Sequence, residues 1–251
     1  MAGKKGRKTI KGTDKPATVY EKSVKQAVLD SKTFFRSLGD LGKSRIIFEK
    51  TCGYGELIAD CLIFTENRGI IGVEIKTAHD TLKRLSKQLD SYVRVCNYVY
   101  VFCHDSHLEA VEALIKRKGL VNTVGIISYI EFKDDVIGGV VKEAQPNSRY
   151  ELTYALEMLW KKQIERVIHM FTDKQEQLAI NTYGGIAPVQ DRRNLSGGMR
   201  MVGQRTSKKN LIRVYVDLLG EVNGTKILCQ QFQTVQPYPD RVLKLYKFKE
   251  D

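Results

Sequence analysis

Hydrophobic residues in the first 142 positions fall into short runs separated by polar and glycine-containing turns. Five of these runs predict β-strands, at residues 46–48, 57–64, 69–76, 98–102 and 124–129. Three stretches with apolar residues at three- and four-residue steps predict helices, at residues 19–37, 80–96 and 106–118. Asp80 stands at the N-cap position of the second helix. The order is helix, three strands, helix, strand, helix, strand, which predicts a mixed α/β sheet flanked by helices.

The pattern changes after a polar, proline-containing stretch that begins near residue 142. Residues 143–251 are predicted to form a C-terminal α+β extension, with one long helix or two over 150–178 and a mobile loop over 181–210. Three later segments alternate apolar and polar residues and predict a small sheet or strands that complete the main one, at 211–219, 225–235 and 241–248. Residues 1–17 predict a disordered basic arm, so the core spans 18–142.

The net charge of the chain indicates what kind of partner it binds. The chain of 251 residues has 41 Lys and Arg against 29 Asp and Glu, a net charge of +12 with a pI near 9.4. Such a surplus favours a polyanion, usually nucleic acid, over an anionic membrane surface, because no amphipathic helix with an aromatic apolar face accompanies it. No run approaches the roughly 18 apolar residues that span a bilayer. We therefore expect a cytoplasmic protein that binds DNA.

Cysteine usage agrees with an intracellular location. The five cysteines are odd in number and form no C-x-x-C pair, which predicts reduced and mostly buried thiols. Cys103, His104 and His107 are spaced like a ligand cluster, but no second Cys or His group follows at finger-like spacing. The sequence therefore does not favour a zinc site.

Charged residues within two apolar strands are the first candidates for chemistry. Asp60 lies inside the strand at 57–64, and Glu74 and Lys76 share one face of the strand at 69–76. The short turn at 65–69 would make these strands antiparallel neighbours, so two carboxylates and an ammonium would converge. Such a place suits Mg²⁺, which is held by one or two carboxylates and keeps several waters. A solvated face of an edge strand, or a structural Asp–Lys pair, is the alternative.

The residues around this constellation resemble a known family. Residues 74–88 read E-I-K-T-A-H-D-T-L-K-R-L-S-K-Q, and Asp60 lies fourteen residues before Glu74. This pattern resembles the PD-(D/E)XK nuclease superfamily, and more narrowly a small bacterial and phage branch of it. The branch also matches at Ala59, Tyr92, His107, Leu108 and Glu109. The resemblance covers about residues 46–128 and implies a restriction-endonuclease-like αβββαβ core.

The resemblance implies a role for each matching position. Asp60, Glu74 and the carbonyl of Ile75 would be ligands of Mg²⁺, for which Mn²⁺ could substitute, and Lys76 would be the catalytic lysine. Glu49 falls where the branch tends to keep an upstream acid, so it is either a metal contact or an exposed acid at a strand end.

Helix residues complete the implied site. Gln88 resembles a glutamine that the superfamily often places on the helix after E-x-K, and Tyr92 shares its helix face. Ile58 departs from the branch, which has arginine there, so a basic contact would have to come from elsewhere, such as Lys83 or Arg84. The basic loop at 192–209 is by default a solvated loop and by hypothesis a DNA-contacting flap, through Arg192, Arg193 and Arg200.

Other conspicuous residues have simpler explanations. His79 reads as a partly exposed turn histidine, His107 as a helix cap as readily as a functional group, and Trp160 as a core residue. The sequence thus predicts a Mg²⁺-dependent deoxyribonuclease of a bacterial cell or a phage-infected host. A catalytically silent DNA-binding protein and a structural or interaction protein are the alternatives, and a homodimer is left open.

Overall fold

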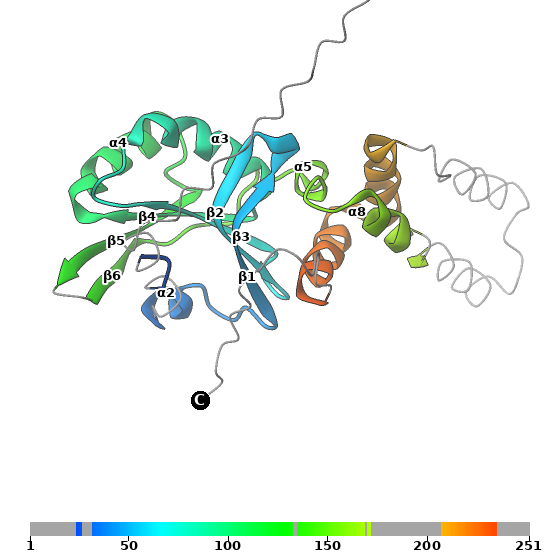
Figure 1. Ribbon diagram of the computed structural model, residues 1–251, viewed down its shortest axis with the longest axis horizontal. Helices are drawn as coiled ribbons and strands as arrows, with labels where there is room; N and C mark the ends of the chain where they lie inside the picture. The colour runs from blue at the N-terminus through cyan, green and yellow to red at the C-terminus, as the bar shows by residue number, and fades with distance from the viewer. Residues whose placement is uncertain (1–23, 27–31, 133–134, 169, 172–206, 235–251) are drawn as a thin grey trace, which may run out of the picture.

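One mixed sheet of six strands dominates the computed structural model, which describes residues 24–26, 32–132, 135–168, 170–171 and 207–234 (Figure 1). The strands are β1 (Ser44–Cys52), β2 (Leu57–Thr65), β3 (Ile70–Lys76), β4 (Tyr98–His104), β5 (Val124–Phe132) and β6 (Asp135–Lys142), and they lie in that order across the sheet. β1, β2 and β3 are antiparallel, β3, β4 and β5 are parallel, and β6 returns antiparallel to β5. The predicted mixed α/β sheet is confirmed.

Helices cover both faces of the sheet. The parallel strands need crossover connections, and α3 (Leu85–Val95) and α4 (Leu108–Arg117) supply them on one face, whereas α2 (Lys32–Ser37) lies on the other (Figure 1). Three short 3₁₀ turns complete these connections. η1 (Gly53–Gly55) joins β1 to β2, η2 (Leu82–Arg84) precedes α3, and η3 (Asp105–His107) precedes α4. The helix predicted from Asp80 therefore begins later, because the Asp80 carboxylate instead accepts bonds from the Thr77 backbone N–H and hydroxyl, at 2.7 and 2.8 Å.

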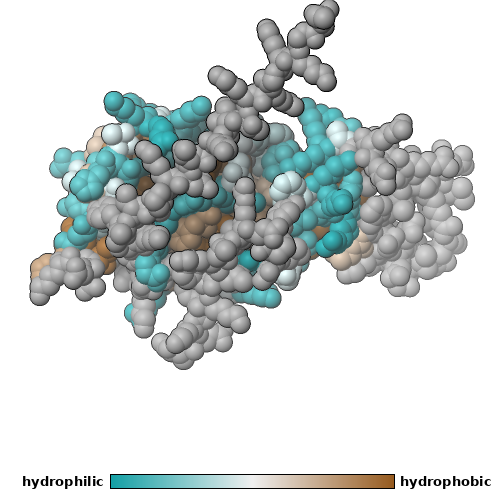
Figure 2. Space-filling view, in the orientation of Figure 1, coloured by the Kyte–Doolittle hydropathy of each residue, from teal (hydrophilic) through white to brown (hydrophobic). Residues whose placement is uncertain are grey.

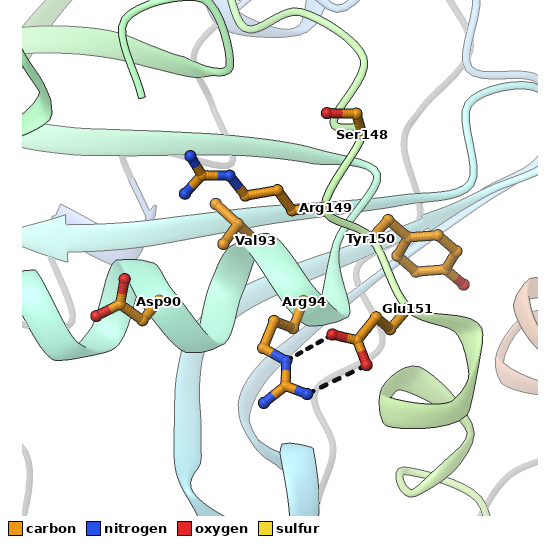
Figure 3. Close-up of a pocket in the computed structure, with 7 residues that line it drawn as sticks. All are labelled: Asp90, Val93, Arg94, Ser148, Arg149, Tyr150 and Glu151. Carbon is orange, nitrogen blue, oxygen red and sulfur yellow. Dashed lines mark hydrogen bonds and ion pairs between the residues drawn. The ribbon is translucent and has the colours of Figure 1, made fainter. Parts of the chain in front are cut away.

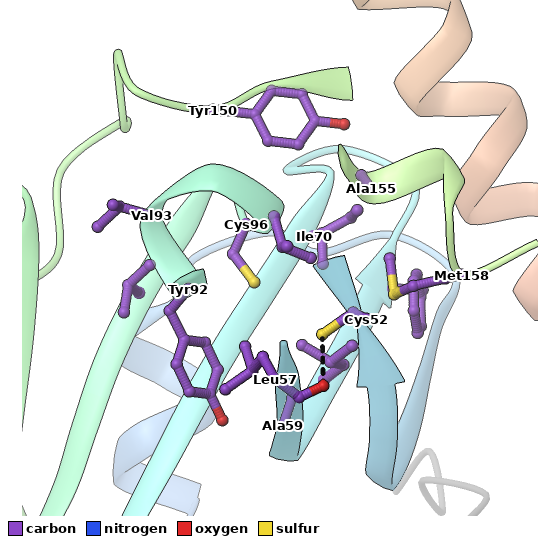
Figure 4. Close-up of a cluster of buried hydrophobic side chains, with 14 of the residues drawn as sticks. Cys52, Leu57, Ala59, Ile70, Tyr92, Val93, Cys96, Tyr150, Ala155 and Met158 are labelled. Carbon is purple, nitrogen blue, oxygen red and sulfur yellow. Dashed lines mark hydrogen bonds between the residues drawn. The ribbon is translucent and has the colours of Figure 1, made fainter. Parts of the chain in front are cut away.

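Two hydrophobic clusters, one on each side of the sheet, hold these layers together. The α3-side core includes Leu62, Leu89 and Tyr92, and Figure 4 shows part of it where Tyr92, Cys96 and Cys52 meet. The α2-side core includes Phe34 and Ile63. A strand with buried residues on both faces reads as a continuous apolar run, which explains why 57–64 and 69–76 were easy to recognise.

Gly72 lets α3 pack closely on β3. A Cβ atom at this position would lie 2.6 Å from the Cys96 sulfur and 2.6 Å from the Tyr92 ring. Contacts this short do not occur between real atoms, so any larger residue would push the helix away from the strand. The position of Tyr92 relative to β3 therefore depends on this glycine.

The described C-terminal residues are helical, which corrects the predicted strands at 211–219 and 225–235. α5 (Leu152–Leu156) and a helix over 161–168 are followed by α8 (Lys208–Thr234), which is interrupted at Gly220 with φ 66° and ψ 177°. Residues 211 and 215, and 228 and 232, are buried at four-residue spacing, which is a helical period that the apparent alternation concealed. Phe232 of α8 stacks on Phe64 of β2, with ring centroids 4.1 Å apart. These helices thus join the same core as the sheet.

Other expectations fare differently. Strand β6 was not predicted, because Gly138 and Gly139 interrupt its apolar pattern. Trp160 is 54% exposed, which contradicts its assignment to the core. The sequence predicted one long helix or two over 150–178, and the described part of this range forms two. Of the helix predicted at 19–37, the described parts, 24–26 and 32–37, are helical. The basic arm at 1–17, the segment at 241–248, and the loop residues Arg192, Arg193 and Arg200 lie outside the described residues.

The surface and the thiols fit the bulk composition. Hydrophilic residues form most of the coloured surface in Figure 2, while hydrophobic ones show near the centre of the view and at the left edge, where Figure 1 places the tips of β5 and β6. Ile130 and Ile137, which face each other there, are 48% and 55% exposed. All five cysteines are free and buried, as predicted. Among the described residues no helix is long and apolar enough to cross a membrane.

Candidate active site

Asp60 and Glu74 lie side by side on the central strands β2 and β3. The regular pairing between these strands ends at Cys61 opposite Val73, so the next step along the register brings Asp60 level with Glu74. In place of the next ladder bond, the Asp60 carboxylate accepts a bond from the Ile75 backbone N–H at 2.9 Å. A side chain thus closes the space between two strands where their regular pairing stops.

Glu74 and Lys76 are buried, so the alternative of a solvated strand face is wrong. Glu74 is 0% exposed and Lys76 is 5% exposed, and β3 is an interior strand of the sheet. The Lys76 ammonium donates to Glu74 Oε1 at 2.5 Å. Both side chains project to the α3 face, because they alternate with Val73 and Ile75, which belong to the α2-side core. The structure therefore leaves a buried ion pair to be explained.

Burial raises the pKa of both carboxyl groups. Burial, followed by the negative charge of Asp60, raises the pKa of Glu74 to about 7, against the opposing effect of Lys76. Burial also raises the pKa of Asp60, whereas the bond from the Ile75 N–H and the charges of Lys76 and Lys25 lower it. Glu74 Oε2 is buried and makes no hydrogen bond among the described residues, because the nearby Tyr92 hydroxyl, which helps to lower the pKa of Glu74, bonds instead to the backbone of Asp60 and Val73. A buried carboxylate oxygen without a donor is costly, so it marks a place where a cation would be stabilised.

Helix α3 supplies two further polar groups. The Tyr92 hydroxyl accepts a bond from the Asp60 backbone N–H at 2.9 Å and donates to the Val73 carbonyl at 3.2 Å, so it links β2 to β3 (Figure 4 shows the ring). Gln88 lies one turn before Tyr92, and because α3 runs back along β3 this turn is nearer to Lys76. Gln88 Oε1 is also buried without a partner in the described part of the chain.

Glu49 lies on β1, opposite Asp60 of β2, but its side chain is paired with Lys25. The register pairs Phe48 with Cys61 and Lys50 with Ala59, which brings Glu49 opposite Asp60. Its backbone is left-handed, with φ 53°, and its side chain is 62% exposed and bonded to Lys25 at 2.5 Å. Of the two sequence alternatives, the exposed strand acid describes this arrangement more closely than a metal contact.

The donor set suits a magnesium ion, although it is small. No group of three or more His, Cys, Asp or Glu side chains in the described residues could hold a metal. Mg²⁺ needs fewer protein ligands than that, since it commonly takes one or two carboxylates and keeps water in the other positions. Asp60, Glu74 with its unpaired oxygen, and the carbonyl of Ile75 are the oxygen donors that fit it.

The other predicted residues are placed as follows. Lys83 and Arg84 are exposed on η2, at the end of α3 that is nearer to the acids. His107 contacts the Thr77 carbonyl through Nε2 at 3.1 Å and so holds the turn after β3, and His79 is exposed there. Cys103 is fully buried and His104 Nδ1 contacts Ser106 Oγ at 2.8 Å, so they do not converge with His107 on a zinc ion.

A pocket lies at the opposite end of α3 and contains none of these acids. It is lined by Asp90, Val93, Arg94, Ser148, Arg149, Tyr150 and Glu151 (Figure 3). Arg94 is bound through a two-pronged ion pair to Glu151, at 2.8 and 3.1 Å, and stacks on the Tyr154 ring at 3.4 Å. Arg94 and Glu151 are therefore already paired with each other, and Asp90 and Tyr150 bond to Lys118 and Thr225 outside the pocket.

Sequence reasoning missed Lys25. It lies 24 positions before Glu49 and 35 before Asp60, and no motif joins these positions, so only the fold brings Lys25 to them. An ion pair between residues far apart in sequence leaves no local signal.

A family model provides the one relationship found for the chain. The model described as bacteriophage P4 protein cII matches residues 14–215. The chain belongs to this family. No curated protein and no solved structure matched it. The match spans all six strands, including β2 and β3 with their acids, and ends at residue 215, within α8.

Proposed function

We propose that this phage-family protein is a Mg²⁺-dependent nuclease that hydrolyses DNA phosphodiester bonds, with a PD-(D/E)XK-like αβββαβ core. The observation that carries the proposal is the unpaired, fully buried Glu74 Oε2 beside Asp60 and the Lys76 ammonium. A carboxylate pair that only stabilised the fold would be expected to have its oxygens satisfied. Mn²⁺ is expected to substitute for Mg²⁺, and the cytoplasm of an infected bacterial cell is the proposed location.

Each residue has a defined task in this proposal. Asp60 and Glu74 hold the ion, which when bound stabilises charge on the phosphodiester and lowers the pKa of a coordinated water. Lys76 positions or deprotonates the attacking water from the same strand face as Glu74. Tyr92 fixes the Asp60 backbone, and exposed Lys83 and Arg84 bind phosphate.

A catalytically silent DNA-binding protein remains the second candidate. The close Lys76–Glu74 pair favours it, because a buried ion pair can persist as a structural feature without doing chemistry. Both candidates bind DNA with a strong salt dependence, so only the chemical step separates them.

The deciding experiment is single-turnover cleavage of single-stranded, duplex and branched DNA, with Mg²⁺ and with EDTA. Wild type should cleave at least one substrate only with Mg²⁺, and Lys76→Met should lower the rate by about 10²–10⁴-fold. Lys116→Met, which removes an exposed charge from α4, is the matched control and should cleave normally. If no substrate is cleaved although DNA is bound, the silent DNA-binding protein is the better description.

A further inference from the structure

The segment before α2 brings a second lysine to the row of acids. Val24 is 1% exposed and belongs to the α2-side core, so it fixes this segment against the sheet. Lys25 follows directly, with 16% of its side chain exposed. Its ammonium pairs with Glu49 and lies 5.8 Å from the centre of the Phe48 ring. Contacts to two neighbouring β1 residues therefore hold this lysine on the strand.

β1 and β2 both change phase where Glu49 faces Asp60. In a regular strand, residues two apart share a face, yet Ala59 belongs to the α3-side core and Cys61 to the α2-side core. The left-handed backbone of Glu49 causes the matching change in β1, where Ile47 and Cys52 lie in the same core although they are five apart. Asp60 thus lies between the two faces, with Glu74 and Lys76 on one and Lys25 on the other.

Electrostatics support this closeness. The positive charge of Lys25 lowers the pKa of both Asp60 and Cys61, so the ammonium acts on this point of β2 as well as on Glu49. The acids are flanked by Lys76, enclosed on the α3 face, and by Lys25, whose partner Glu49 is 62% exposed. Of these two lysines, Lys25 is paired with a carboxylate that is in contact with solvent, whereas Lys76 is paired with the buried Glu74.

We propose that Lys25 binds a phosphate oxygen of the nucleic acid at this site and exchanges Glu49 for the phosphate when substrate binds. The inference rests on the proposed function for the identity of the substrate. The exchange is favourable because an ion pair to a largely exposed carboxylate contributes little, whereas an ammonium–phosphate bond is charge-assisted. Glu49 can be rehydrated where it stands. In this arrangement Glu49 holds Lys25 in place before binding and competes with the phosphate for it.

Opposite effects of two substitutions test the exchange. DNA binding is measured across salt concentrations with EDTA and with Ca²⁺, which takes the same oxygen ligands as Mg²⁺. Lys25→Met should weaken duplex binding several-fold and reduce the slope of log K against log salt by about 0.9. Glu49→Gln should strengthen binding, because it removes the carboxylate that competes with phosphate for the lysine, and Lys25→Arg should retain the salt slope. Lys116→Met is the control for loss of one distant charge, and thermal unfolding verifies that each variant is folded.

Two outcomes would overturn the proposal. If Lys25→Met changes binding no more than Lys116→Met does, Lys25 does not touch phosphate. If Glu49→Gln weakens binding as Lys25→Met does, the pair only orders the N-terminal segment. The readout is independent of cleavage: a protein that never cleaves but shows the opposite effects refutes the nuclease alone, and one that cleaves without them refutes the role of Lys25 alone.

Discussion

Polar groups near the two ends of helix α3 differ in whether they have hydrogen-bond partners. At its C-terminal end, Asn147 donates to the carbonyls of Val93 and Cys96, at 2.5 and 2.8 Å, and Arg94 is bound to Glu151. At its N-terminal end, Gln88 Oε1 and, on the adjacent strand, Glu74 Oε2 are buried without partners in the described residues. Glu74 at the N-terminal end is 0% exposed and Asn147 at the C-terminal end is 9% exposed, yet only the Asn147 side chain bonds to neighbouring groups with both of its polar atoms.

This difference separates polar residues that build the fold from those available for a ligand. Buried polar groups normally find hydrogen-bond partners, so an unsatisfied pair on facing elements is a reason to look for a missing cation or donor. The satisfied end also contains the pocket of Figure 3, so a recess in the surface is here a weaker indication of chemistry than an unpaired oxygen. Substitutions at the two ends should therefore affect different properties.

The largest expected effect is on catalysis, at the unsatisfied end. Glu74→Gln should lower metal-dependent cleavage by about 10²–10⁴-fold or more, because it removes the charge that binds the ion. Stability should be unchanged or higher at pH 8, since a buried, repelled carboxylate is replaced by a neutral group. Single-turnover cleavage and thermal unfolding of the same preparation measure both. Normal cleavage by a folded Glu74→Gln protein would remove the basis of the proposed site.

The satisfied end should show the reverse. Asn147→Ala leaves the Val93 and Cys96 carbonyls without their donor and should cost about 1–3 kcal/mol of unfolding free energy. That corresponds to a lower Tm by roughly 2–12 °C for a chain of this size. Cleavage by the folded fraction should be close to wild type. A variant that is fully stable but inactive would mean that the two ends are not functionally distinct.

The sequence predicted the elements better than it predicted their contacts. Strands β1 to β5 and helices α3 and α4 were found because their apolar periods are unambiguous, and Asp60 and Glu74 could be placed together from a five-residue turn. The α8 segments were mistaken for strands, because short amphipathic stretches fit both periods until their neighbours are known.

The unsatisfied state of Glu74 and the position of Lys25 were beyond the sequence. Whether a carboxylate oxygen has a donor depends on every element around it, and the Lys25–Glu49 pair depends on how a distant segment packs. Exposure of Trp160 was missed for the same reason, since the residue lies just before the helix over 161–168 and the sequence does not indicate which side of that position is covered.

Glu74 should also make the stability of the metal-free protein depend on pH. Its pKa in the folded protein is about 7, above the value of roughly 4.3 for an unfolded chain. Between these values the folded state binds the proton more tightly, so stability should fall as pH rises through this window. With EDTA present, the Tm of wild type should decline by a few degrees more than that of Glu74→Gln between pH 5 and pH 8. Parallel pH profiles would show that Glu74 does not titrate in this range.

The smallest expected effect lies in the ion pair at the C-terminal end of α3. Arg94 and Glu151 have side chains that are 36% and 43% exposed, so water screens their attraction and each could be solvated alone. Glu151→Gln keeps the shape of the side chain and should cost less than about 1 kcal/mol, with a further decrease of this effect at high salt. Thermal unfolding at low and high salt measures it. Because Arg94 also stacks on Tyr154, the cation keeps one contact after the substitution. A loss as large as that of Asn147→Ala would place the Arg94–Glu151 pair among the buried polar contacts that build the fold.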